Sequence, residues 1–182
     1  MRGRAADSAR PRFVCAMRYC IGIGCVLAAV LAAAFTFPRH LVLEIVHANT
    51  GQMMLCAEMA DGEEFVLSFV HSVNKRPVYD TLRAERDSVV IVKSRFDSFG
   101  AGMPDASTNQ GTLRVAEDGW LEWTTNRSLP DVTVRVGRVA NHTLHLKGRE
   151  IPLTDLAQPG TPLTLRSQRG SIYTVWKGRC IR

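Results

Sequence analysis

Short runs of alternating apolar and polar residues follow one another along most of the chain, separated by turn residues. The run VTVRV (132–136), for example, alternates valine with polar residues, which is typical of a β-strand with one face in water. Asp118-Gly119 between two such runs favours a tight hairpin, because glycine accepts a positive φ. We find no credible amphipathic helix among these runs. The expected strands, about ten, are 41–48, 52–59, 64–72, 77–84, 88–94, 112–116, 120–125, 132–136, 142–147, 162–167 and 171–176.

Many short strands in one chain predict an all-β fold, because antiparallel strands can be joined by tight turns and buried on one face only. We expect an antiparallel β-sandwich or a partly closed barrel. One N-terminal apolar helix is expected to precede it.

The N-terminal part of the chain differs from the rest. A basic region, residues 1–18, is followed by a charge-free apolar stretch, residues 19–38. This order is typical of an export signal whose basic end stays in the cytoplasm. The stretch barely reaches the ~20 apolar residues of a membrane anchor, and the small residues 32–34 are also typical of a cleavable signal peptide. Both interpretations stay open, and translation from Met17 would give a more compact signal.

Either interpretation predicts that residues 40–182 form an exported β-domain in the periplasm, tethered to the inner membrane or released. The composition agrees with one globular domain: the chain has 182 residues, of which 46% are hydrophobic and 22% are charged. Its net charge is +6, but residues 1–37 carry +4 of it and residues 38–182 only +2. Because no stripe of Lys and Arg remains in the β-domain, we do not expect a nucleic-acid partner.

Cys56 and Cys180 are the cysteines of the expected exported part. In an oxidising compartment they could form a disulfide. Alternatively, Cys56 could be a buried thiol, because it lies within an apolar strand pattern, MMLCAEM. The sequence leaves both possibilities open.

Two expected strands bring a histidine and a carboxylate to one face of a sheet. His71 shares its face with the apolar residues at 65, 67 and 69, and Asp80 shares its face with those at 78 and 82, by the period of two. If the strands form a hairpin across residues 72–77, His71 lies diagonally near Asp80. The pair could form a ligand-binding or proton-handling site, or it could only hold the hairpin together. Ser72 points to the opposite face, so it forms no nucleophile–base pair with His71.

A second feature is the glycine-containing stretch FDSFGAGMP (96–104). Gly100 and Gly102 suggest a tight backbone path whose N–H groups could bind an anion, or a connector that closes one end of the fold. We expect no metal site, because His142 and His145 are three residues apart and face opposite sides of a strand. No cofactor fingerprint is present. The candidate ligand- or partner-binding residues are therefore His71, Ser72, Asp80, Gly100 and Gly102.

Four stretches resemble a bacterial family, domain-of-unknown-function family 1850 (DUF1850). The resemblance covers roughly residues 41–168 and is carried by EFVLSFVHSVNKRPVYD (64–80), SRFDSFGAGMP (94–104), GWLEWTTNRSLPDVTVRVGRVANHTLHL (119–146) and GREIPLTDLAQPG (148–160). The family has no established activity. Its genes tend to lie beside those of tripartite ATP-independent periplasmic (TRAP) transporters of the TAXI type, so the resemblance implies a small periplasmic companion protein.

Two function classes follow from these observations. The first is a membrane-tethered or periplasmic accessory protein, not an enzyme, that contacts the membrane subunits or the solute-binding subunit of a TAXI-type transporter. The second is a periplasmic domain that binds or hydrolyses a small molecule with His71 and Asp80. The sequence favours the first class, because it shows neither a nucleophile nor metal-ligand spacing beside these residues.

Overall fold

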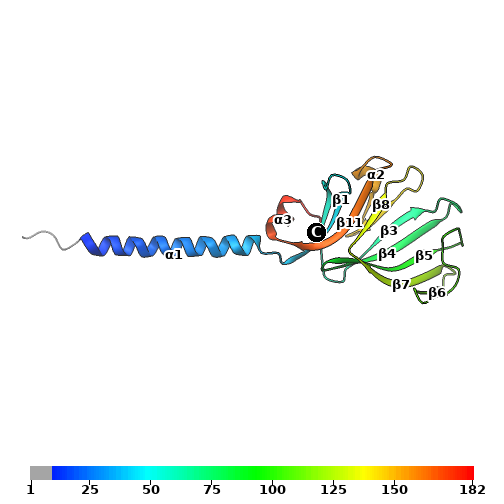
Figure 1. Ribbon diagram of the computed structural model, residues 1–182, viewed down its shortest axis with the longest axis horizontal. Coiled ribbons are helices and arrows are strands. Elements are labelled where there is room, and N and C mark those ends of the chain that lie inside the picture. Colours follow the sequence, from blue (N-terminus) through cyan, green and yellow to red (C-terminus); the bar gives the residue numbers. More distant parts are fainter. Residues whose placement is uncertain (1–9) are drawn as a thin grey trace, which may run out of the picture. The chain divides into compact units, whose positions relative to one another are not determined.

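The computed structural model describes residues 10–182, with side chains from residue 22 onward. The chain divides into two units, residues 1–37 and residues 38–182 (Figure 1). The first unit contains helix α1 (Arg10–Thr36), and residues 1–9 of the predicted basic region lie outside the described residues. No helix in residues 10–182 is both long enough and apolar enough to cross a membrane. The export signal in residues 19–38 stays a prediction.

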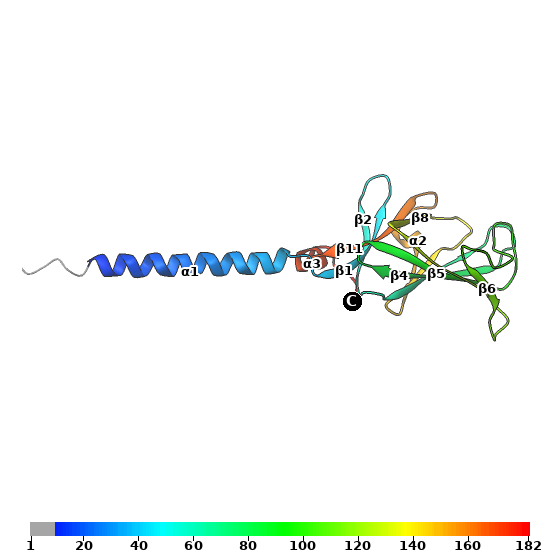
Figure 2. The ribbon, with the colours of Figure 1, turned by 60° about the horizontal axis from the view of Figure 1, so that its bottom comes forward.

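The second unit contains two antiparallel sheets (Figures 1 and 2). The four-stranded sheet has the order β2-β1-β11-β8 and the seven-stranded sheet the order β10-β9-β3-β4-β5-β7-β6. The strands of the first sheet are β1 (His40–His47), β2 (Met53–Met59), β8 (Asp131–Arg135) and β11 (Pro162–Gly170). Those of the second are β3 (Glu64–Val70), β4 (Pro77–Glu85), β5 (Ser88–Phe96), β6 (Thr112–Val115), β7 (Leu121–Leu129), β9 (Thr143–Leu146) and β10 (Arg149–Pro152).

The core lies between the two sheets, because each contributes one apolar face. Leu43 and Ile45 of β1 and Leu165 of β11 pack in one buried cluster with Phe65 of β3 and Leu82 of β4. The four-stranded sheet covers only part of the larger one. Its main contacts are with β4 and β5, and β7 and β6 continue the larger sheet beyond them (Figure 1). Strands β3, β4, β5 and β9 contribute buried residues to this core, whereas β6 and β7 contribute none.

The prediction of a mainly antiparallel β fold is confirmed, with two separate sheets and no closed barrel. The strand predicted for residues 171–176 is wrong, because Ile172–Lys177 form helix α3. Ser171 caps this helix by accepting a hydrogen bond from the backbone N–H of Thr174 at 3.1 Å. The short β10 and the following helix α2 (Leu153–Leu156) were not predicted either.

Helix α3 covers the outer face of the four-stranded sheet, the face turned away from the core. Its buried residue Val175 packs with Val42 of β1 and Cys56 of β2. Cys56 and Cys180 form a disulfide, and Ile181 pairs with Ala57 at the edge of β2. Of the two possibilities for these cysteines, the structure has the bridge, and it fixes the C-terminal segment to β2.

Candidate functional site

The β3–β4 hairpin does not bring His71 and Asp80 together. Its register pairs Leu67 with Asp80, and the backbone N–H of His71 donates to the carbonyl oxygen of Arg76 at 2.9 Å. The loop is therefore shorter than expected, and the register differs from the predicted one by two residues. A shift of two keeps every side chain on its face but separates the histidine from the carboxylate along the strand. The predicted His71–Asp80 pair is wrong.

His71 instead lies beside Gly100, the residue of the second predicted feature. A Cβ atom at Gly100 would come within 3.1 Å of the His71 Cε1 atom and 2.9 Å of the Asn74 Nδ2 atom. Asn74 donates from this nitrogen to the carbonyl oxygens of Ser98 at 3.1 Å and Phe99 at 3.3 Å. Only glycine fits this approach without movement of the neighbours, so the two loops close one end of the seven-stranded sheet.

The other predicted residues of these loops take no part in that closure. Ser72 is exposed, and its carbonyl oxygen accepts a hydrogen bond from Lys75 at 2.5 Å. Gly102 has a φ of 83°, and a Cβ atom there would have nothing within 4 Å, so backbone conformation rather than space favours glycine. The structure therefore supports the connector interpretation for residues 96–104.

Asp80 lies in the middle of the seven-stranded sheet, on the face that looks toward the core. It pairs with Ser94 of β5, which in turn pairs with Trp123 of β7. The Ser94 hydroxyl donates to the Asp80 carboxylate at 2.5 Å. Burial raises the pKa of Asp80 above its ordinary value of 3.8, and the hydrogen bond from Ser94 partly opposes this. A carboxyl group held in this way next to a cavity is a candidate functional group.

The cavity beside Ser94 has a volume of about 550 Å³ and lies over β5 and β7, at the edge of the covered part of the sheet. Thr125 Oγ donates to the carbonyl oxygen of Gln110 at 2.8 Å and so holds the 105–111 loop at one side. We call this cavity the Trp123 pocket. Its lining residues are Ile91, Ser94, Gln110, Trp123, Thr125 and Arg127.

The indole ring of Trp123 is fixed by very close packing. A Cβ atom at Gly111 would lie 2.6 Å from Trp123 Cζ2 and 2.6 Å from the carbonyl oxygen of Thr124. Such distances exclude any side chain at this position while the backbone stays in place. The loop therefore presses its glycine against the ring, so that the indole is held as one wall of the pocket.

The Trp123 pocket offers an apolar wall and several polar groups. Arg127 is exposed, and its guanidinium has no ion-pair partner among residues 22–182 that the structure describes side chain by side chain. The Ser94 hydroxyl is oriented toward Asp80, so it is not activated by a neighbouring histidine as a nucleophile would be. In the described part of the chain, no three His, Cys, Asp or Glu side chains could together hold a metal ion. This arrangement fits the binding of a small ligand or a peptide segment.

On the opposite face of the same strands, Glu122 is the centre of a charge cluster. It is only 4% exposed, yet it accepts hydrogen bonds from Lys93 Nζ at 2.8 Å and Arg114 Nε at 2.9 Å. Arg95 Nε lies 3.9 Å from the same carboxylate. The bond from Lys93 is the main cause of the lowered pKa of Glu122; burial acts in the opposite direction, and the bond from Arg114 adds to the lowering.

We expect Glu122→Gln to lower the free energy of unfolding at pH 7 by about 1–3 kcal/mol, because three cations lose their shared carboxylate. Because the pKa of Glu122 is lowered in the folded state, its ionised carboxylate stabilises the fold at pH values above the ordinary pKa of 4.5. This stabilisation is lost as the pH falls through the pKa of the folded state. The difference between wild type and variant in urea unfolding should therefore shrink at pH 3. Glu117→Gln, an exposed control in the adjacent hairpin, should change little. Equal stability of the Glu122 variant at pH 7 would contradict the cluster's role.

Sequence reasoning found Asp80 but missed the residues around it. Ser94, Gln110 and Arg127 have no distinctive spacing, and the pocket depends on which strands become neighbours in the sheet. One signal was present: Trp123 alternates with Thr125, so these two residues share one face of β7. Arg127 lies beyond the irregularity in the pairing of β5 with β7.

The fold and the pocket together define a β-domain of two unequal sheets with a pocket over β5 and β7. Residues 65–153 match the model of a protein family described as a domain of unknown function (DUF1850). The match supports this family for the stretch from β3 to the start of α2, which contains all seven strands of the larger sheet. No curated protein and no solved structure shows a significant match to the chain.

Proposed function

We propose that the chain is an exported accessory protein of a tripartite ATP-independent periplasmic transporter of the TAXI type, and that it acts by binding and not by catalysis. The observation that carries the binding role is the Trp123 pocket, which lies on the family-matched strands beside the half-buried Asp80. The link to a transporter is what the resemblance to the family implies. The partner would be a membrane subunit or the solute-binding subunit.

Export to the periplasm is supported by two features. The Cys56–Cys180 disulfide suits an oxidising compartment, since such bridges rarely persist in the cytosol. The apolar stretch of residues 19–38 follows a basic region, which is the order of an export signal. The N-terminal segment would either tether the β-domain to the inner membrane or be removed after export.

A second candidate function is a periplasmic domain that binds a small molecule without a transporter. The volume of the Trp123 pocket, about 550 Å³, falls in the range of small-molecule sites. Hydrolysis by His71 and Asp80 has lost its geometric support, because the hairpin register separates these two residues.

The transporter proposal is tested with the full chain carrying a C-terminal tag. A reporter active only outside the cytoplasm, fused after Arg182, should be active. The tagged chain should co-purify with transporter subunits in mild detergent, and its deletion should alter solute uptake. Arg127→Ala, at the pocket, should weaken this capture, whereas Arg149→Ala, an exposed residue on the opposite edge strand of the same sheet, should not.

Two outcomes would count against the proposal. Normal uptake after deletion, with no captured subunit, would favour the small-molecule function. A silent extracytoplasmic reporter, with a cytoplasmic one active, would overturn export itself.

A further inference from the structure

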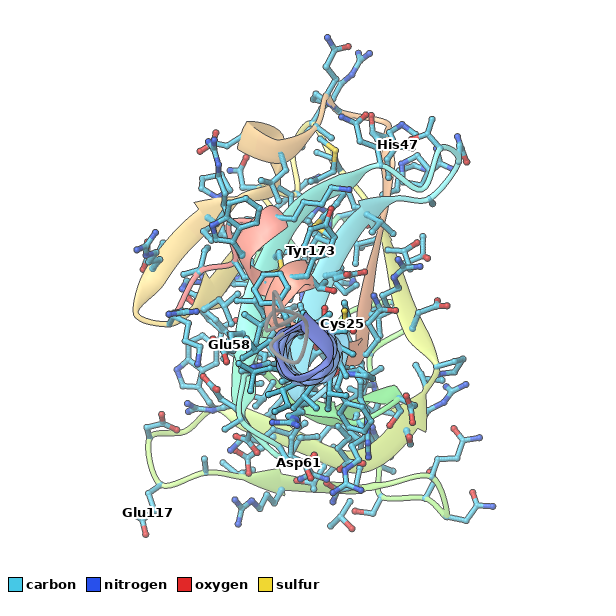
Figure 3. All side chains as sticks on the ribbon, turned by 90° about the vertical axis from the view of Figure 1, so that its left-hand side faces the viewer. Cys25, His47, Glu58, Asp61, Glu117 and Tyr173 are labelled. Atoms are coloured by element: carbon cyan, nitrogen blue, oxygen red, sulfur yellow. A yellow bond between two sulfur atoms is a disulfide. The ribbon has the colours of Figure 1, made fainter. Side chains whose placement is uncertain are left out.

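Helix α3 presents large apolar side chains to solvent. Trp176 is 72% exposed, Tyr173 44% and Ile172 40%, while Val175 on the other side of the helix is buried against the four-stranded sheet. Large apolar side chains that are exposed together on one surface mark sites of contact with a protein or a membrane. In Figure 3, which views this end of the β-domain, Tyr173 lies on the side that faces the viewer.

The exposed residues are held in place, because α3 is fixed at both ends. At its start, Ser171 caps the helix, and Gly170 packs so closely that a Cβ atom there would lie 2.7 Å from Val42 Cγ2. At its end, Cys180 is joined to β2 by the disulfide. A helix of six residues is too short to be stable alone. The fold therefore supports α3 with tertiary contacts while Trp176 stays largely exposed to solvent.

The same part of the chain is uniformly basic. After Asp155 the sequence contains no Asp or Glu up to Arg182. Lys177 and Arg179 are exposed, and the Lys177 Nζ lies 5.7 Å from the centre of the Tyr173 ring. The cations of this segment are Arg166, Arg169, Lys177, Arg179 and Arg182, of which Arg166 pairs with Glu44 and Arg182 with Glu58.

We infer that α3 contacts the surface of an anionic lipid bilayer. The contact surface, called the α3 surface below, consists of Ile172, Tyr173, Trp176, Lys177 and Arg179. Tryptophan and tyrosine favour the headgroup region because their rings are apolar and carry a polar N–H or O–H. Lysine and arginine beside them are attracted to anionic headgroups. Aromatic and basic side chains on one short helix suit this interface.

The position of α3 in the fold agrees with this inference. The chain enters the β-domain at the start of β1, where His40 pairs with Gly170, and α3 begins two residues after Gly170. Helix α3 therefore begins at the end of the four-stranded sheet where β1 begins. The inference rests on the proposed export, because export places the domain beside a membrane.

The apolar surface also continues into a groove between β2 and α3. This groove has a volume of about 540 Å³, and Met53, Met54 and Leu55 of β2 line it together with Tyr173 and Lys177. Flexible methionine side chains adapt to differently shaped apolar groups. Apolar parts of the lipid would bind in this groove, beside the basic Lys177.

The test uses tryptophan fluorescence of the full chain with vesicles of phosphatidylcholine and phosphatidylglycerol, some of them brominated in the acyl chains. We expect brominated lipid to quench part of the emission of the wild-type chain. Trp176→Phe should remove most of this quenching. Trp120→Phe is the matched control and should keep it, because Trp120 directly precedes β7 of the seven-stranded sheet, whereas α3 packs on the four-stranded sheet.

A second variant tests the charges. Lys177→Glu combined with Arg179→Glu should reduce the quenching in vesicles with phosphatidylglycerol, and raised salt should reduce it in the wild type, because salt screens exposed charges. Circular dichroism checks that each variant is folded. Quenching that is the same in wild type and Trp176→Phe would overturn the lipid contact. The lipid contact would also be overturned if brominated lipid did not quench the wild-type chain and the charge variant lost transporter capture. The α3 surface would then bind a protein.

Failure of this inference differs from failure of the proposed function. An unquenched Trp176 with an active extracytoplasmic reporter overturns only the lipid contact. A silent reporter overturns export, whatever the vesicles show.

Discussion

Replacing both cysteines of the disulfide with serine, Cys56→Ser and Cys180→Ser, is expected to lower the free energy of unfolding by about 2–5 kcal/mol. The two residues are 124 positions apart in the sequence, so the bridge restricts nearly the whole β-domain in the unfolded state. In the folded state it fixes the C-terminal segment to β2 and holds α3 on the outer face of the sheet. The loss is a large share of the total stability of an ordinary domain.

Urea unfolding of the oxidised chain, the reduced chain and the double variant measures this effect. The reduced wild type and the variant should have similar midpoints, well below that of the oxidised chain. Cys25→Ser is the matched control, because Cys25 is an exposed free cysteine in α1, and its substitution should leave the midpoint unchanged. A double variant as stable as the oxidised wild type would show that the bridge contributes nothing to the fold.

Strands such as β8 and β11 were predictable because their burial follows the period of two. In β8, half-buried valines alternate with exposed polar residues, as the pattern of residues 132–136 predicts. Segment 171–176 misled the prediction because Ile172, Tyr173 and Val175 are typical strand residues. The capping serine before them and the glycine after Lys177 were the local signals of a helix. These signals are weak for six residues, and the helix depends on contacts with β1 and β2.

The candidate site was only partly predictable, because it depends on register and strand order. Alternation placed His71 and Asp80 on the correct faces, but a hairpin shifted by two residues has the same alternation. The loop that sets the register includes Lys75 with a positive φ of 57°, a conformation that does not follow from its residue type. The neighbours of Asp80 could not be predicted for another reason. Strands β4, β5 and β7 become adjacent only in the folded sheet.

Asp80 is expected to stabilise the fold less than asparagine would at the same position. Burial raises its pKa above 3.8, so the folded state binds the proton more tightly than the unfolded state does. The stability of the wild type therefore falls as the pH rises from about 3.8 through the higher pKa of the folded state. Asp80→Asn removes this cost and keeps an oxygen that accepts the hydrogen bond from Ser94. We expect the variant to be more stable than the wild type at pH 7 by about 1 kcal/mol, and no more stable at pH 3.

The same variant separates a binding role of Asp80 from a structural one. If the carboxylate serves the Trp123 pocket through Ser94, Asp80→Asn should lose transporter capture although it unfolds at a higher urea concentration. Such an exchange of stability for function is typical of binding sites. Ser94→Ala is the companion variant: it removes the hydroxyl between Asp80 and the pocket, and it should lose capture as well. An Asp80→Asn chain that is less stable than the wild type at pH 7 would show that the charged carboxylate supports the fold. An Asp80→Asn chain that captures the transporter as well as the wild type does would show that the pocket does not depend on Asp80.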